Sequence, residues 1–223
     1  MSGRSPELDW SFVLERWPLL AKGVVLDVYM AVLGTIAACA IGLAIVSLRN
    51  SSWVVLSRSA YAYTQITRGI PFYVLLLWLY FGIASYFDLA LSAISCTIIA
   101  LAITDSGKTA EIFRGGFLAI DPGQLDASDA IGLSRSQRYF DVLMPQVIRI
   151  VIPPLGNVFV GQIKGATFAA AIAVPEMVFQ AQEMSVTFFR PFEAFASVAI
   201  ILVTLVLAFS LAFLAAERAL RLP

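Results

Sequence analysis

Long apolar runs separated by short polar segments dominate the pattern of this chain. The run from Ala194 to Ala216 contains no ionisable residue and, as a helix, is long enough to cross about 30 Å of hydrocarbon. Ile70 to Phe87 is a second run of this kind. Because backbone groups in lipid must be hydrogen-bonded within their own segment, we predict that these runs are helices. The pattern predicts an all-α integral membrane protein.

The same pattern predicts about five membrane-spanning helices in a single transmembrane domain covering residues 1–223. We expect the spans at about residues 22–48, 54–87, 89–117, 147–174 and 191–216, with a break in the second near Gly69-Ile70-Pro71. Residues of about 118–146 form a polar loop between the third and fourth spans. No segment repeats at a fixed period.

The composition supports a membrane protein and argues against a nucleic-acid partner and a metal site. Hydrophobic residues make up 60% of the chain and charged residues 13%, against roughly 25% charge in a soluble domain. Net charge is zero, so nothing indicates a nucleic-acid partner. The absence of histidine removes the commonest general base and metal ligand, and we predict no metal site. Cys39 and Cys96 fall in apolar spans and are expected to be buried hydrophobes.

The distribution of cations predicts the orientation in the membrane. Lysine and arginine in short connections favour the cytoplasmic side. Such cations occur in the first link, in the 118–146 loop and in the tail: Arg49, Arg58, Arg135, Arg138, Arg218 and Arg221. We therefore expect a cytoplasmic C-terminus and an external N-terminus, whose charges are mixed and include Arg4 and Glu7. The first 20 residues lack a continuous apolar core, so we expect no cleavable signal peptide.

The polar loop contains helix signals of its own. Asp121-Pro122-Gly123 is a turn signal, and residues 124–131 after it can form two helical turns. Leu125, Ser128 and Ile131 are expected on one face, and Gly132 is expected to end the helix in a left-handed conformation. The negative charges of Asp126 and Asp129 lie near the helix start, where they are favourable.

A second helix start follows in the same loop. Ser134 and Gln137 match a capping box, and Pro145 is expected to mark the turn back towards the membrane. A two-turn helix is unstable alone in water, so the first helix is expected to pack into a groove on another protein. Packing on the neighbouring spans is the alternative that the pattern leaves open.

The loop resembles a known signature. Asp126-Ala127-Ser128, then three residues, Gly132, nine residues and Val142-Leu143-Met144-Pro145 resemble the "EAA" signature of the membrane subunits of bacterial ATP-binding-cassette importers. That signature reads Glu-Ala-Ala, Gly and Ile-x-Leu-Pro, and this chain departs from it conservatively at four positions: Asp126, Ser128, Val142 and Met144.

Other segments along the chain carry the same resemblance, most closely to the polar amino acid permease branch. That branch imports histidine, arginine, glutamine, glutamate, opines and similar solutes. The segments that resemble it are Arg68-Gly69-Ile70-Pro71, the stretch 110–116, Pro153-Pro154-Leu155-Gly156-Asn157 and Phe189-Arg190-Pro191-Phe192-Glu193.

The resemblance implies a type I importer permease fold with a cytoplasmic coupling helix, in the bacterial cytoplasmic (inner) membrane. It implies a second permease subunit, a copy or a paralogue, a dimer of ATP-binding-cassette ATPase subunits, and an extracytoplasmic solute-binding protein. ATP and Mg would be bound by the ATPase; this chain has no Gly-x-x-x-x-Gly-Lys-Ser/Thr segment, and we expect no cofactor on it. The residues implied in coupling to the ATPase are Gln124, Leu125, Asp126, Ala127, Ser128, Ile131, Gly132 and Pro145.

Charged residues within the spans are expected to face a cavity or a partner. Lys108 either pairs with Asp105, three residues away on one helix face, or meets a solute carboxylate. Arg68 is expected to hold backbone carbonyls freed by the break, and Asp27 to be hydrated near the outer end of the first span.

By resemblance, Lys164-Gly165-Ala166-Thr167 takes the place of the family's Lys-Asp-Thr-Ser near the transport path. Gly165 replaces the acidic residue that would meet a solute ammonium, so the solute is not expected to be a simple cationic amino acid. By resemblance, some acidic amino acid members have arginine at the position of Lys108, which favours a solute with a negative group; opine and ectoine-like solutes are further candidates. The predicted substrate path comprises Arg68, Lys108, Lys164, Thr167 and Glu176.

Two other classes of protein compete with this interpretation. An ion-coupled secondary transporter or channel would need its own ion site and usually shows an inverted repeat, of which there is no sign. An intramembrane enzyme would need Lys108 or Lys164 as the base for a serine, and Ser106 is poorly placed for Lys108 on a helix. The importer permease is the favoured function.

Overall fold

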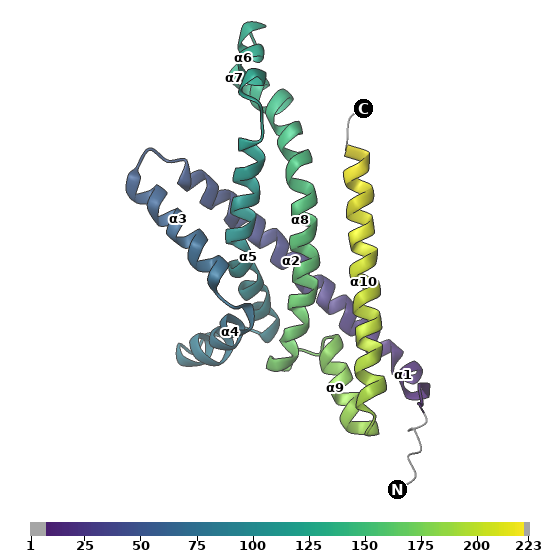
Figure 1. Ribbon diagram of the computed structural model, residues 1–223. Coiled ribbons are helices and arrows are strands. Elements are labelled where there is room, and N and C mark those ends of the chain that lie inside the picture. Colours follow the sequence, from purple (N-terminus) through teal and green to yellow (C-terminus); the bar gives the residue numbers. More distant parts are fainter. Residues whose placement is uncertain (1–7, 221–223) are drawn as a thin grey trace.

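The computed structural model describes residues 8–220 and shows an all-helical chain with no strand in that range (Figure 1). The predicted fold class is confirmed. Arg4, Glu7 and Arg221, used above to predict orientation, lie outside the described residues. In chain order the elements are α1 (Ser11–Glu15), α2 (Trp17–Arg49), α3 (Val54–Gly69), α4 (Phe72–Leu77), η1 (Trp78–Ala84), α5 (Ala93–Leu118), α6 (Pro122–Ala130), α7 (Arg135–Gln137), η2 (Arg138–Leu143), α8 (Met144–Ala166), η3 (Thr167–Ile172), α9 (Met177–Phe188) and α10 (Pro191–Leu220).

Three helical segments are long and apolar enough to cross a membrane, at 17–49, 135–172 and 191–219. The predicted second span is a fourth only if α3 and α4–η1 are counted together, and these two are bent by 99°. The break at Gly69-Ile70-Pro71 is confirmed: Ile70 is extended, as the residue before a proline prefers. The predicted third span, α5, is not among the three. From its middle onwards it carries four charged side chains: Asp105, Lys108, Glu111 and Arg114.

The helices place two sets of short elements at opposite ends of the molecule. Figure 1 shows α6 and α7 beyond the ends of α5 and α8, with the C-terminal end of α10 at that same end. Elements α1, α4 and α9 lie at the opposite end. The chain therefore has a tip, formed by α6 and α7, and a far end, where α9 packs against α2 and α10.

Helix α5 is the central element and packs against α2, α3 and α8. Small residues bring it close to its neighbours, as is usual where membrane helices meet. At Gly42 on α2, an added Cβ would lie 2.3 Å from Oγ1 of Thr109 and 2.9 Å from the nitrogen of Ala110. The Thr109 hydroxyl donates a hydrogen bond of 2.7 Å to the carbonyl of Ala38. This contact joins the C-terminal halves of α2 and α5.

The loop between α5 and α8 differs from the sequence prediction in two respects. Helix α6 covers Pro122–Ala130, so Ile131 lies just outside it rather than in its last turn. Pro145 does not mark a turn: the helix runs without a stop from Arg135 to Ile172. The π-helical segment η2 directly precedes α8, whose first turn holds Pro145, where a missing N–H is tolerated. Helices α1 and α9 were not predicted from the sequence.

Candidate functional site

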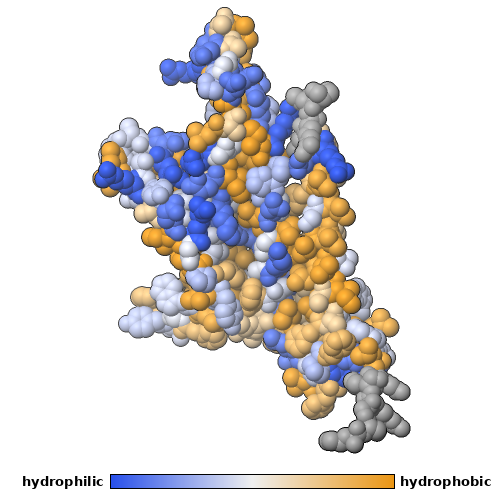
Figure 2. All heavy atoms as spheres, in the orientation of Figure 1, coloured by the Kyte–Doolittle hydropathy of each residue, from blue (hydrophilic) through white to orange (hydrophobic). Residues whose placement is uncertain are grey.

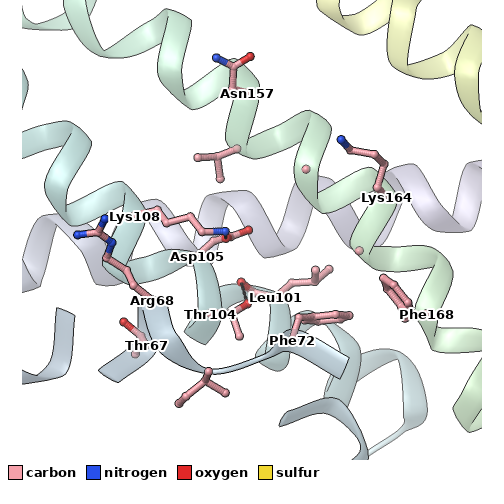
Figure 3. Close-up of a pocket in the computed structure, with 14 residues that line it drawn as sticks. Thr67, Arg68, Phe72, Leu101, Thr104, Asp105, Lys108, Asn157, Lys164 and Phe168 are labelled. Atoms are coloured by element: carbon pink, nitrogen blue, oxygen red, sulfur yellow. Dashed lines mark hydrogen bonds and ion pairs between the residues drawn. The ribbon is translucent and has the colours of Figure 1, made fainter. Parts of the chain in front are cut away.

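A pocket of about 440 Å³ opens between α3, α5 and α8 (Figure 3). Its floor is apolar and lies towards α4, where the rings of Phe72 and Phe168 are 6.1 Å apart between centroids. Its walls carry most of the polar side chains. The lining residues are Thr67, Arg68, Ile70, Phe72, Leu101, Thr104, Asp105, Lys108, Asn157, Val158, Gly161, Lys164, Gly165 and Phe168.

Lys108 and Asp105 form an ion pair at the pocket wall, which is one of the two interpretations that their spacing left open. The Nζ of Lys108 lies 2.6 Å from Oδ1 of Asp105. The Asp105 side chain is nearly buried, whereas 56% of the Lys108 side chain is exposed. Lys108 therefore satisfies the buried carboxylate and still presents part of its ammonium group to the pocket (Figure 3).

Arg68 and Lys164 contribute two further cations to this pocket. Neither forms an ion pair or side-chain hydrogen bond with any of residues 8–220, and both are exposed. The expectation that Arg68 holds freed backbone carbonyls is therefore wrong. With three cations and one carboxylate, the pocket has an excess of positive charge in a region where charge is costly to leave uncompensated.

Two residues of the predicted substrate path do not line this pocket. The Thr167 hydroxyl donates a 2.7 Å hydrogen bond to the carbonyl of Lys164. Glu176 is fully buried at the start of α9, where its side chain accepts hydrogen bonds from the N–H groups of Val178 and Phe179. Glu176 is therefore corrected from a path residue to a helix cap at the far end.

The sequence analysis missed three polar lining residues: Thr67, Thr104 and Asn157. One signal could have found Asn157. Asn157, Gly161 and Lys164 are spaced by four and three residues, the spacing that places side chains on one face of a helix. Only the fold shows that this face meets the polar residues of α5.

Hydrophilic residues also dominate much of the surface around the pocket. Figure 2 shows them gathered over α3 and α5, while α10 presents an apolar surface. The apolar helix suits contact with lipid tails. The hydrophilic face does not, because polar and ionisable groups in the hydrocarbon normally face a protein partner or a water-filled cavity.

The second candidate site is the tip formed by α6 and α7. Asp121 caps α6 by accepting a 2.7 Å hydrogen bond from the N–H of Gly123. Gly132 has φ of 77°, which confirms the predicted left-handed stop. Both hydrogen bonds of the predicted capping box between Ser134 and Gln137 are present. The local helix signals of the loop were therefore correct.

The predicted coupling residues divide into exposed and inward-facing groups. Ser128 is buried and Leu125 is partly buried, so these two face the chain's own helices. Ile131 is 75% exposed, and the prediction that it shares their face is wrong because α6 ends before it. The exposed members are Gln124, Asp126, Ala127, Ile131, Gly132 and Pro145.

The tip is fastened to the helices that line the pocket. Asp129 on α6 forms an ion pair with Arg138 on η2, and η2 continues directly into α8. At the end of α5 nearest the tip, Glu111 pairs with Arg49 of α2 and with Arg114, 2.7 Å away. Helix α8, which continues from η2, also carries Asn157 and Lys164, which line the pocket.

Comparisons with known proteins agree with this architecture. Residues 30–221 match the family described as binding-protein-dependent transport system inner membrane component. The chain is 32% identical over 208 residues to the glutamine transport system permease protein GlnP of Escherichia coli, covering 92% of this chain and 95% of GlnP. It is 30% identical over 218 residues to the probable amino-acid permease protein YxeN of Bacillus subtilis, covering 97% of each.

Solved structures have the same fold. The chain superposes with a TM-score of 0.87 on a crystal structure of an amino acid ABC transporter with histidines, at 29% identity and covering 95% of this chain and 99% of that one. An inward-facing MetNI methionine ABC transporter gives a TM-score of 0.76 at 20% identity, which shows the fold alone. The match over most of the chain, with the arrangement of pocket and tip, places this protein in the family of binding-protein-dependent transport system inner membrane components.

Proposed function

We propose that this chain is the permease subunit of an ATP-driven importer for an amino acid or an amino-acid-like solute. The observation that carries the proposal is the tip: a capped two-turn helix held beyond the bundle and fastened to the helices that line a charged pocket. The relatives with a printed function are amino-acid permeases, which supports the solute class.

In this proposal α6 is the coupling helix and docks on a separate ATPase subunit that binds ATP and Mg. The exposed side chains of Gln124, Asp126 and Ala127 would meet the ATPase, while the buried Ser128 faces its own chain. The tip would then lie in the cytoplasm with the C-terminal end of α10, and α1 and α9 would face outward, towards an extracytoplasmic solute-binding protein.

A second permease subunit, a copy of this chain or a paralogue, would cover the hydrophilic face. An ionisable group costs about 2.5–3.5 kcal/mol at the centre of a membrane helix that faces lipid. Arg68, Lys108 and Lys164 lie on the open side of the pocket, so leaving that side in lipid would carry a cost of this kind for each. A partner permease and a solute path between the two subunits remove that cost.

The charges of the pocket favour a solute whose net charge is negative or zero over a cationic amino acid. The carboxylate of Asp105 is paired with Lys108, and Gly165 has no carboxylate that could bind a solute ammonium. Arg68 and Lys164 remain available for carboxylates. Acidic amino acids, opines and ectoine-like zwitterions fit this arrangement better than arginine or lysine.

The coupling role is tested by copurification and uptake. Asp126→Lys and Gly132→Asp should still insert into the membrane but lose the ATPase partner and ATP-driven uptake. Glu15→Lys, a charge reversal on exposed residue 15 of α1 at the far end, is the control for the copurification and should keep the ATPase partner. Normal transport by the Asp126 and Gly132 variants would contradict the assignment of α6.

The solute class is tested with the cognate binding protein. Its affinity should be measured for aspartate, glutamate, opines and ectoine against arginine and lysine. Tight and selective binding of arginine or lysine would contradict the proposed charge preference while leaving the importer function intact.

A further inference from the structure

Two carboxylic acids are buried against each other at the far end of the bundle, away from the pocket. Asp27 belongs to α2, and Glu176 caps the start of α9. Both side chains are fully buried and are in hydrogen-bond contact. The expectation that Asp27 is hydrated is therefore wrong: α9, which the sequence did not predict, covers it.

The four carboxylate oxygens of Asp27 and Glu176 have too few hydrogen-bond donors around them. Glu176 accepts hydrogen bonds of 2.8 Å from the N–H groups of Val178 and Phe179, as the cap of α9. One Asp27 oxygen accepts a long bond of 3.4 Å from the N–H of Met177, and the other has no donor among residues 8–220. An ionised carboxylate only accepts hydrogen bonds, whereas a protonated one also donates. A proton on Asp27 would supply the missing donor.

Within the described part of the chain, no cation compensates the two acids. The charged residues on the helices packed around the two acids have other contacts or face away. Arg16 lies over the ring of Phe188, and Glu193 accepts a hydrogen bond from Arg190. Lys22 and Glu183 are exposed. Glu15 on α1 is exposed, and the cation on this half of α8, Lys164, lines the pocket. None of the residues from 8 to 220 forms an ion pair with Asp27 or Glu176.

We propose that Asp27 and Glu176 form a proton-binding site, in which one shared proton fastens the first turn of α9 to α2. Two carboxylates in contact at a fully buried site do not both carry a charge, because burial and their mutual repulsion both disfavour the second charge. Asp27 then donates its proton to the Glu176 carboxylate, whose negative charge is stabilised by the N-terminus of α9. The site is separate from the coupling tip and from the pocket.

The backbone packing makes the site depend on close contact. An added Cβ at Gly23 would lie 2.6 Å from the nitrogen of Met177, so the start of α9 rests directly on α2. Loss of the proton would place two negative charges in contact, and the first turn of α9 would have to lift so that water reaches them. Burial raises the pKa of Glu176, opposed by the hydrogen bonds from Val178 and Phe179. That direction agrees with a site that retains a proton.

The sign of the pH effect follows from proton counting. The closed state binds one more proton than an open state with hydrated carboxylates, so rising pH favours opening. The effect starts above the ordinary carboxyl range, near pH 4, and is at most about tenfold in the opening equilibrium for each pH unit, until the closed site itself loses its proton.

Two measurements on the full chain in lipid nanodiscs test the proposal. Infrared spectroscopy of the wild type at neutral pH should show the carbonyl band of a protonated carboxylic acid, and Asp27→Asn should lack it. Hydrogen exchange of the first turn of α9, corrected for the intrinsic pH dependence, should show protection that falls with rising pH in the wild type. In Asp27→Asn, where the amide still donates to Glu176, protection should not change with pH.

Glu183→Gln is the matched control, because Glu183 is an exposed acid on the same helix; it should behave like the wild type in both measurements. A wild-type spectrum without the acid band would overturn the shared proton whether or not the variant folds. Protection that follows the sodium or calcium concentration at fixed pH would overturn it in favour of a cation. Protection of the first turn of α9 that does not change with pH in the wild type would show that no shared proton holds α9 to α2.

Discussion

The contact between α2 and α5 gives the sharpest stability prediction. Gly42→Ala places a Cβ 2.3 Å from Oγ1 of Thr109 and 2.9 Å from a backbone nitrogen, so the two helices must separate. Overpacking of this kind costs about 1–3 kcal/mol. The separation also strains the 2.7 Å hydrogen bond from Thr109 to Ala38. Since each kcal/mol shifts Tm by about 2–4 °C for a chain of this size, we expect a drop of about 4–8 °C at the middle of that range.

Two variants separate steric effects from hydrogen bonding in the same assay, thermal unfolding of the purified chain. Thr109→Val keeps the shape but loses the hydrogen bond and should cost about 0.5–1.5 kcal/mol. Gly115→Ala is the control: on the same helix α5, its added Cβ meets nothing within 4 Å, and it should be neutral or raise Tm, since alanine is favoured over glycine in a helix by about 0.5–1 kcal/mol. Equal Tm values for the Gly42 and Gly115 variants would refute the close contact.

The remaining predictions concern the tip and the pocket. Gly132→Ala should destabilise the tip by about 1–2 kcal/mol because φ at this position is 77°, and hydrogen exchange across α6 should rise; unchanged exchange would argue against the left-handed stop. Arg138→Gln removes the ion pair with Asp129, whose side chain is 60% exposed, so global stability should change by less than about 1 kcal/mol; a large loss in Tm would show that the pair is not solvated. Lys164→Met should weaken uptake of an anionic solute about tenfold to a hundredfold, the value of a hydrogen bond to a charged group, whereas Arg58→Met, exposed on α3 outside the pocket, should not; equal effects of the two would indicate a general charge effect.

The sequence was informative where the signal was local. Asp121, Gly132 and the Ser134–Gln137 capping box were interpreted correctly because each acts on its own backbone within a few residues. The Asp105–Lys108 pair was one of two interpretations left open by the spacing, and one helix face was enough to bring the two together. The break before Pro71 followed from the conformational limits of a proline and its neighbour.

The errors arose where distant segments meet. The bend of 99° after α3 depends on what α4 and η1 pack against, and no residue near Pro71 specifies that angle. A proline opposes a helix interior, so the sequence predicts a turn at Pro145, but this residue lies in the first turn of α8 after a π-helical segment. Asp27 was assigned to water because α9, which covers it, lies about 150 residues further along the chain and was not predicted.

Hydrophobic length, charge placement and helix caps are properties of consecutive residues, so the sequence alone determined that this chain is a helical membrane protein with a capped polar loop and a set of charged residues in its spans. The tertiary structure decided which of those charges share a site. It brought Arg68, Lys108 and Lys164 from three helices into one pocket, and it moved Glu176 away from them to Asp27. The reason is physical: the role of a charged group in a membrane protein depends on the groups that solvate it in place of water. Those groups come from other helices, and the packing of those helices cannot be predicted from the residues next to the charge.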